Sequence, residues 1–470
     1  MKHNILFAGL VATLTLFGCE GGSDNESNDV TESNYSGVWD RKGYGELIEI
    51  SNSTATLYQY TVSTCLKVDQ GSTDELFDSF GVPALESDDK LIFKSSESQV
   101  FNTSFTKITQ LPEGCHSQNL LSGPSPETTV EHFIQSFDDY YAFFNERGVS
   151  WSEKSNSLLE TTSPEMSDQA LFSALSDALA GIDDGHVMLT AETQNFRPVK
   201  PRGANRVIEE SFEQQTEYTD IQEYANHLSD KYTHNLSAYF DDGSVELIDG
   251  TYGPSFIAAT INDGQVGYLS ISNMAFLSTV EDGLDLKSNL DVVDQVFPEF
   301  LDQFSSTHAM VVDIRNNSGG MDEVALRMVA YFLSNRQQFG SKFARTAYGE
   351  FNHQQAWVEP ATDSPYLNPV ILITGGATAS AAEIFTLAMK SLPQVTQIGE
   401  STSGMLSDVL EKELPNGWGI WMANEVYQDI NGQSFESIGI EPEQEVLTFS
   451  IEAINSGKNP AIELALQLIQ

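Results

Sequence analysis

A serine at the start of a predicted helix is the main candidate for a nucleophile in this chain. Ser380 lies in the stretch Gly-Gly-Ala-Thr-Ala-Ser-Ala-Ala-Glu over residues 375–383, after an apolar run that predicts a buried strand. There its hydroxyl lies near unpaired backbone N–H groups and the positive end of the helix dipole, which suits a reaction that creates an oxyanion. Serine is also a favoured N-cap, so this segment alone does not separate a nucleophile from a cap.

Two further segments carry groups that such a serine would need. Residues 313–320 read Asp-Ile-Arg-Asn-Asn-Ser-Gly-Gly, and the glycines permit a loop that turns N–H groups toward one point. A simple tight turn is the alternative there. Residues 183–187 read Asp-Asp-Gly-His-Val, in which His186 has the chemistry of a general base. A lone loop histidine is more often structural, but no other histidine of the chain lies in a comparable glycine-hinged turn.

The order of five segments is more informative than any one of them. Asp-Gly-His is followed by Asp-x-Arg-x-Asn-x-Gly-Gly, by Ser-Ala-x-Glu, by Gly-Glu-x-Thr-x-Gly at 399–404 and by Glu-x-x-Gly-Ile-x-Pro at 436–442. This series resembles the carboxyl-terminal processing protease and tricorn core family of serine peptidases, over roughly residues 186–443 and the helices before them. The resemblance implies an α/β fold with a crotonase/ClpP-like spiral catalytic core, and hydrolysis of peptide bonds through an acyl-enzyme.

That family contains two catalytic arrangements, and one residue separates them. Processing proteases have a lysine base after the last glycine of Thr-x-Gly, but this position is Met405 here. A thioether cannot take a proton from serine. Neither Lys390 nor Lys412 fits the place of the lysine well, so the serine/lysine arrangement is disfavoured.

The tricorn-like arrangement of serine, histidine and glutamate matches at each place. The resemblance therefore implies Ser380 as nucleophile, His186 as general base and acid, and Glu436 as the carboxylate that orients the imidazole. Glu441 and Glu443 are alternatives for the third member.

Backbone N–H groups are the predicted oxyanion donors: those of Gly319 or Gly320 in the glycine loop, and that of Ala381 after the serine. We expect no metal or other cofactor, because neither Cys65 nor Cys115 has a histidine-bearing motif of metal-ligand spacing beside it.

The hydrophobic pattern predicts the elements that hold these groups. Residues 255–470 alternate strands with helices, and the apolar run at 310–314 indicates a strand buried on both faces of a sheet, so this range is the predicted catalytic core. Residues 125–195 predict a helical bundle that leads to the histidine loop. Residues 196–254 are polar and predict a linker region without a clear PDZ domain, so tail specificity is not supported.

Residues 35–120 alternate polar and apolar side chains and predict a small antiparallel β domain. A structural spacer and a partner-binding module are both open for it. Cys65 and Cys115 lie in this part, and two such cysteines in an exported chain favour a disulfide between them.

The first residues predict export and a lipid anchor. Lys2 and the short apolar run at 5–17 are typical of a signal peptide. Leu-Phe-Gly-Cys at its end resembles a bacterial lipobox, which implies a signal peptide over 1–18 and acylation of Cys19; an ordinary cleaved signal is the alternative. Residues 19–34 are polar and acidic, as in a flexible tether.

Residue 20 and the net charge bear on location and partners. Glu20 is not the aspartate usually linked to inner-membrane retention, so we expect the bacterial outer membrane, on its periplasmic side. A net charge of −45 disfavours nucleic acid and anionic lipid headgroups as partners. The expected partners are a peptide or unfolded-protein substrate and, through the lipid, a membrane. An esterase using the same residues and a non-catalytic ligand-binding lipoprotein of this fold are the alternatives.

Overall fold

The computed structural model describes residues 35–94, 100–121, 123–278 and 285–469. The predicted signal peptide (1–18), the lipidation residue Cys19 and the rest of the predicted tether lie outside these described residues. None of the described helices combines the length and the hydropathy that crossing a membrane requires.

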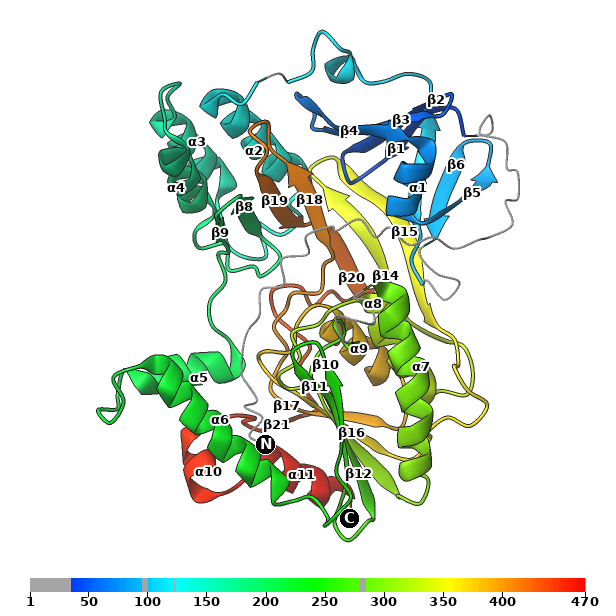
Figure 1. Cartoon of the computed structure of the whole chain (residues 1–470), viewed down its shortest axis with the longest axis vertical. Helices are drawn as coiled ribbons and strands as arrows, with labels where there is room; N and C mark the ends of the chain where they lie inside the picture. Colours follow the sequence, from blue (N-terminus) through cyan, green and yellow to red (C-terminus); the bar gives the residue numbers. More distant parts are fainter. Residues whose placement is uncertain (1–34, 95–99, 122, 279–284, 470) are drawn as a thin grey trace.

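A seven-stranded mixed sheet forms the centre of the C-terminal part of the chain (Figure 1). Its strands, in spatial order, are β10 (Glu246–Gly250), β11 (Gly253–Ile261), β12 (Val266–Ile271), β13 (Ala309–Asp313), β16 (Val370–Thr374), β17 (Val395–Gly399) and β21 (Gln444–Glu445). Pairing is antiparallel from β10 to β12 and parallel from β12 to β21. Every residue of β13 and β16 is buried, which explains why both strands read as continuous apolar runs.

Helices cover both faces of this sheet. Met310 and Val312 pack in one core, and Val311 between them packs in another, because successive side chains of a strand point to opposite faces. The first core contains α7 (Leu286–Gln303), α8 (Asp322–Val329) and α9 (Ala381–Lys390), and the second contains α5 (Gly203–Phe212), α6 (Ile221–Ser237), α10 (Ile451–Ser456) and α11 (Pro460–Ile469). The architecture is mixed α/β.

Residues 196–254 differ from the linker region that we predicted. They contain α5, α6, β10 and the first residues of β11. Tyr224, Leu228 and Tyr232 lie four residues apart on one face of α6 and are buried against the sheet. Asp220 caps this helix by accepting a hydrogen bond from the Glu223 N–H at 2.9 Å. The buried stripe is rich in tyrosine, so the composition reads as polar although the segment is folded.

A second group of helices and strands packs around the histidine loop. The helices α2 (Pro126–Tyr140), α3 (Trp151–Thr161) and α4 (Asp168–Leu179) pack against a sheet of order β18-β19-β8-β9. Its strands are β18 (Val409–Glu413), β19 (Gly419–Ala423), β8 (Met188–Ala191) and β9 (Gln194–Phe196). Strand β8 directly follows the histidine loop and pairs with β19, as in Trp421 opposite Met188. A third sheet has the order β15 (Gly349–Val358), β14 (Gln337–Thr346), β20 (Glu425–Asp429).

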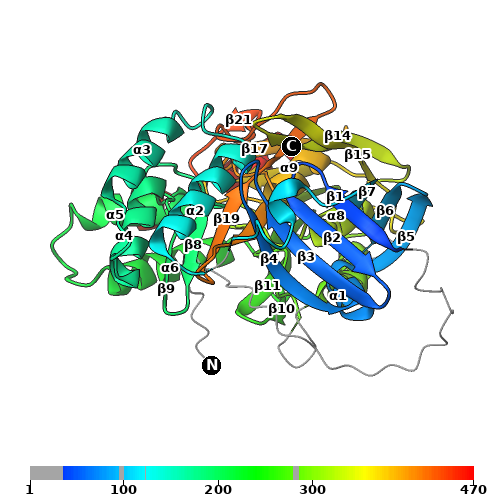
Figure 2. The ribbon, with the colours of Figure 1, turned by 90° about the horizontal axis from the view of Figure 1, so that it is seen from above.

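The N-terminal residues form an antiparallel sheet of their own. Its order is β4 (Cys65–Ser72), β3 (Thr54–Tyr60), β2 (Glu46–Ser51), β1 (Gly37–Arg41), β7 (Thr103–Ile108), β6 (Lys90–Lys94), β5 (Val82–Ser87), with α1 (Thr73–Phe80) packed against it. Figure 2 shows this sheet beside the helices α2 to α4. Cys65 and Cys115 are joined by a disulfide with an S–S distance of 2.07 Å.

The turn between β1 and β2 is buried in the C-terminal part. Lys412 Nζ, on β18, donates hydrogen bonds to the carbonyl oxygens of Tyr44 and Gly45. The Tyr44 hydroxyl donates to the Glu425 carboxylate on β20. Lys412 is only 2% exposed and has no carboxylate partner among the described residues, and burial lowers its pKa to about 8. The N-terminal sheet and the C-terminal part of the chain therefore share buried polar contacts.

Candidate active site

Ser380 lies at the end of the turn that follows β16, directly before α9. Its backbone has a φ of 56° and a ψ of −130°, a strained conformation for a residue with a side chain. Its N–H donates to the Met405 carbonyl oxygen at 3.0 Å, and its hydroxyl makes no hydrogen bond that caps α9. The alternative of a plain N-cap therefore does not describe this serine.

The histidine loop meets Ser380 across 194 residues of sequence. His186 Nε2 lies 3.2 Å from Ser380 Oγ, which is hydrogen-bonding distance. Burial lowers the pKa of His186 below its usual 6.5, and the charges of Asp184 and Asp408 only partly oppose this shift. The imidazole is therefore neutral near pH 7, as a general base requires.

Glu436 does not make the predicted hydrogen bond to His186. Its Oε2 accepts from the N–H groups of Leu406 and Ser407 at 2.8 and 3.1 Å, and its Oε1 accepts from Arg147 at 2.6 Å. His186 Nδ1 has no hydrogen-bond partner among the described residues.

The two alternative glutamates are not bonded to His186 either. The Glu443 carboxylate pairs with Lys390 at 3.0 Å. Glu441 contributes its backbone carbonyl oxygen to the same lysine at 2.9 Å.

Arg147, which the sequence analysis missed, joins Glu436 to the histidine loop. Its Nε lies 3.1 Å from Asp184 Oδ2, and its Nη1 donates to the Asp183 carbonyl oxygen at 2.6 Å. Asp184 in turn accepts from the His186 backbone N–H at 2.9 Å. Glu436 therefore reaches His186 only through Arg147 and Asp184, and it holds the loop rather than the ring. No motif marks Arg147, which follows α2 without a neighbouring candidate residue.

One of the predicted oxyanion donors is occupied, and two are free. The Gly319 N–H donates to the side chain of Asn317 at 2.8 Å, which removes it from the set. The N–H groups of Gly320 and Ala381 have no hydrogen-bond partner among the described residues. A Cβ on Gly319 would lie 2.7 Å from Ser380 Cβ, so the glycine loop runs directly against the serine.

Met405 and Glu383 position the loop that holds Ser380. The Met405 sulfur would lie 2.7 Å from a Cβ on Gly185, so the thioether fills the space beside the histidine loop. Glu383, the glutamate of Ser-Ala-x-Glu, accepts hydrogen bonds from Thr402 Oγ1, the Gly404 N–H and the Met405 N–H at 2.5, 2.8 and 2.7 Å. Burial raises the pKa of Glu383 to about 7, and the three donors oppose this shift.

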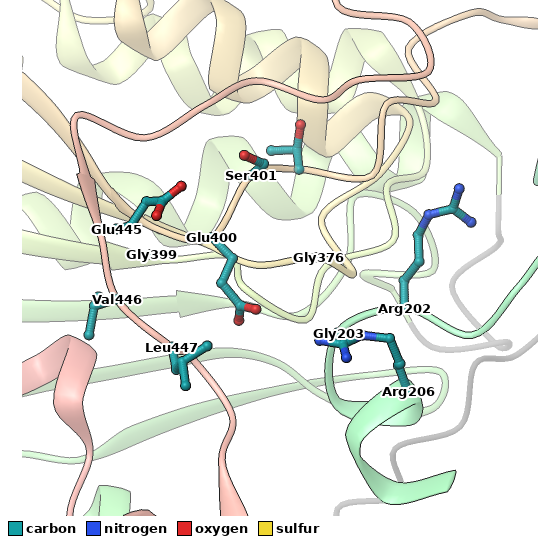
Figure 3. A pocket seen from close by; sticks show the side chains of 11 residues that line it. Arg202, Gly203, Arg206, Gly376, Gly399, Glu400, Ser401, Glu445, Val446 and Leu447 are labelled. Atoms are coloured by element: carbon teal, nitrogen blue, oxygen red, sulfur yellow. The ribbon is translucent and has the colours of Figure 1, made fainter. Parts of the chain in front are cut away.

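A cavity of about 600 Å³ adjoins the turn before Ser380. Gly376 of that turn lines it, together with Arg202 and Arg206 on one side and Glu400 and Glu445 on the other (Figure 3). Among the described residues, no group of three or more histidine, cysteine, aspartate or glutamate side chains is arranged to hold a metal ion.

The mixed α/β fold places the Ser380 hydroxyl and the His186 imidazole at hydrogen-bonding distance, the geometry that a serine-type peptidase needs. A model of peptidase family S41 matches residues 265–446, a range that contains Ser380 but not His186. Residues 265–446 therefore form a serine-type peptidase domain similar to that of family S41.

Curated relatives match parts of this range. A carboxyl-terminal-processing protease of Picosynechococcus sp. is 28% identical over 138 residues, which cover 29% of this chain and 31% of that protein. A candidate tricorn protease homologue of Streptomyces coelicolor is 24% identical over 221 residues, 46% of this chain and 16% of that protein. The chain thus spans about a third or less of the length of these relatives.

A solved structure supports the fold. A candidate peptidase from Parabacteroides merdae superposes with a TM-score of 0.57 at 22% identity, over 74% of this chain and 97% of that one.

Proposed function

We propose that this chain hydrolyses peptide bonds through an acyl-enzyme on Ser380, with His186 as general base and then general acid. The observation that carries the proposal is the 3.2 Å approach of His186 Nε2 to the hydroxyl of a backbone-strained serine. Nε2 accepts the hydroxyl proton while Oγ attacks the peptide carbonyl carbon. The N–H groups of Gly320 and Ala381 stabilise the oxyanion that forms.

The remaining proton transfers use the same imidazole. The protonated His186 donates to the leaving amine nitrogen as the peptide C–N bond breaks, which leaves the acyl group on Ser380. Water then attacks the acyl carbon while Nε2 accepts its proton; the bond between the acyl carbon and Oγ breaks as Nε2 returns that proton to Oγ, which releases the carboxylic acid product and regenerates the serine. In this mechanism Glu436 is a positioning residue that acts through Arg147 and Asp184.

The finer parts of the proposal concern topology, anchoring and location. We place the catalytic core in the crotonase/ClpP-like spiral class that the family resemblance implies.

We further propose a lipid anchor on Cys19 and an outer-membrane location facing the periplasm, where the Cys65–Cys115 disulfide would persist. Incorporation of an alkyne-labelled fatty acid that is lost in Cys19→Ser would support the anchor, and incorporation that persists would contradict it.

A fluorophosphonate probe tests the catalytic pair. Ser380→Ala and His186→Ala should each abolish labelling, whereas Ser391→Ala, at the other end of α9, should label like the unmodified protein. Labelling that persists in Ser380→Ala would end the proposal. Hydrolysis of an unfolded protein substrate, absent in Ser380→Ala, distinguishes a peptidase from an esterase, which would cleave only acyl esters.

A further inference from the structure

A buried lysine outside the catalytic pair lies at the centre of a charged cluster. Lys342, on β14, donates hydrogen bonds from Nζ to Asp408 Oδ2 at 2.6 Å, to Glu425 Oε2 at 2.7 Å and to the Tyr427 hydroxyl at 3.1 Å. The Tyr427 oxygen also lies 2.7 Å from Asp322 Oδ2 and 3.2 Å from Asp408 Oδ1. We call these five residues the Lys342 cluster.

Three carboxylates and one ammonium give the Lys342 cluster an excess of negative charge, which a bound proton reduces. The Tyr427 hydroxyl has one hydrogen but lies within hydrogen-bonding distance of both Asp322 and Asp408. Burial, and then the charge of Asp408, raise the pKa of Asp322 well above its usual 3.8. A protonated Asp322 therefore donates to the Tyr427 oxygen, and the Tyr427 hydroxyl donates to Asp408.

The Lys342 cluster connects two loops that flank the nucleophile. Asp322 follows Gly320, a predicted oxyanion donor of the glycine loop, by two positions. Asp408 follows Met405 by three positions, and the Met405 carbonyl oxygen accepts from the Ser380 N–H at 3.0 Å. A shift of the Lys342 cluster would therefore reach the oxyanion donor and the backbone of the nucleophile.

The glycine loop has support from two sheets. Met274, which follows β12 of the seven-stranded sheet, donates its N–H to the Gly319 carbonyl oxygen and accepts from the Met321 N–H, both at 2.9 Å. The Asp322 side chain adds the contact with Tyr427 on β20, a strand of the third sheet. The Lys342 cluster thus supplies the side-chain part of this support.

The N-terminal part of the chain covers the Lys342 cluster. The Tyr44 hydroxyl, from the turn between β1 and β2, donates to Glu425 Oε1. The centre of the Phe101 ring lies 4.3 Å from Lys342 Nζ, and this ring packs edge to face on Tyr427. Both aromatic residues are buried, so they exclude water and strengthen the charge pairs of the cluster.

We propose that Lys342 is a positioning residue for catalysis, which holds the glycine loop through Asp322 and the Met405 loop through Asp408, and that Tyr44 of the N-terminal sheet completes this arrangement. The N-terminal sheet thereby contributes to the rate of the reaction as well as to folding. Oxyanion donors act only when they lie about 2.7–3.1 Å from the oxyanion, so a small displacement of Gly320 lowers the rate. This inference rests on the peptidase function proposed above.

Fluorophosphonate labelling kinetics, resolved into kinact and KI, test the positioning role. Lys342→Met removes the ammonium but keeps an unbranched side chain, and it should lower kinact about tenfold to a hundredfold while KI changes less than about twofold. A lysine needed only for folding would lower the final extent of labelling, because less protein would be folded, and would leave kinact of the folded fraction unchanged.

Tyr44→Phe tests the N-terminal sheet with the loss of a single hydroxyl, and it decides the question if Lys342→Met does not fold. We expect kinact to fall about threefold to tenfold. Tyr60→Phe is the matched control, because the Tyr60 hydroxyl donates to Asp40 at 2.9 Å within the N-terminal sheet, away from the Lys342 cluster. Its kinact should equal that of the unmodified protein.

Two substitutions of Asp322 test the link to the glycine loop. Asp322→Ala removes the contact with Tyr427 and should lower kinact about tenfold. Asp322→Asn should recover most of this loss, because an amide can donate where the protonated carboxyl donates. An Asn variant as slow as the Ala variant would overturn the link through Asp322.

The unmodified protein separates the failure of this inference from the failure of the peptidase proposal. If Tyr44→Phe and the folded Lys342→Met variant keep kinact, or change only KI, the positioning role is wrong, while Ser380-dependent labelling still supports the peptidase. If the fluorophosphonate does not label Ser380 in the unmodified protein, both proposals fall.

Discussion

The contact between Gly319 and the nucleophile allows a quantitative prediction for Gly319→Ala. The new Cβ would lie 2.6 Å from the Ala379 oxygen, 2.7 Å from Ser380 Cβ and 2.9 Å from the Ala381 nitrogen. Ordinary contact begins at 3.4 Å, so the serine and the glycine loop must separate by about 0.7 Å. A misplacement of about 1 Å in an active site lowers the rate about a hundredfold, so we expect fluorophosphonate labelling to slow by roughly that factor.

Backbone strain must be separated from this displacement. Gly319 has a φ of +101°, so alanine there would also lose about 1–3 kcal/mol of unfolding free energy from conformation alone. Gly417→Ala is the matched control, because Gly417 has a φ of +81° and nothing lies within 4 Å of its added Cβ. Urea unfolding should show a loss in both variants, and the labelling rate should fall only in Gly319→Ala. Equal labelling rates in the two variants would refute the inference that the close contact between Gly319 and Ser380 positions the nucleophile.

Three further predictions follow from the site and the disulfide. Burial lowers the pKa of His186, so the labelling rate should be constant near neutral pH and fall with acidification only below pH 6.5; a midpoint above 6.5 would contradict the buried base. Burial raises the pKa of Glu436 to about 8, so the carboxylate is fully ionised only above that pH, and Arg147 keeps Asp184 as a second partner. Above pH 8, Glu436→Gln should therefore lower the unfolding free energy by about 1–3 kcal/mol while labelling is slowed less than in His186→Ala; complete loss of labelling in the folded variant would require a direct contact with the imidazole. Replacing both Cys65 and Cys115 by alanine opens a 50-residue loop and should lower the unfolding free energy by about 4 kcal/mol in urea titrations, and an unchanged midpoint would contradict this.

The sequence was most informative where a residue type alone restricts the chemistry. Met405 in the place of a lysine base indicated His186, and the structure brings that histidine to Ser380. The buried strands β13 and β16 were likewise readable, because a short continuous apolar run between turn residues is typical of a strand covered on both faces. The five ordered segments correspond to loops that lie at or beside Ser380 in the structure.

The sequence could not predict contacts that depend on how loops are placed in space. Gly319 and Gly320 are equivalent in the motif, and only the hydrogen bond from Gly319 to Asn317 separates them. The partner of Glu436 is Arg147, 289 residues away in the chain and outside any motif. The α6 helix is a different case, because the sequence does contain its signal. Tyr224, Leu228 and Tyr232 lie at helical spacing, but the polar composition of the segment led to the prediction of a linker.

The buried turn between β1 and β2 connects the N-terminal sheet to the strands β18 and β20 through hydrogen bonds. Lys412 uses the carbonyl oxygens of Tyr44 and Gly45 as its acceptors, so a chain shortened to begin at residue 125 would lose both of these hydrogen bonds. Loss of the Tyr44 hydroxyl would also leave Glu425 with one donor fewer beside Lys342. Domain boundaries drawn from the 265–446 family match would therefore separate residues that share buried hydrogen bonds.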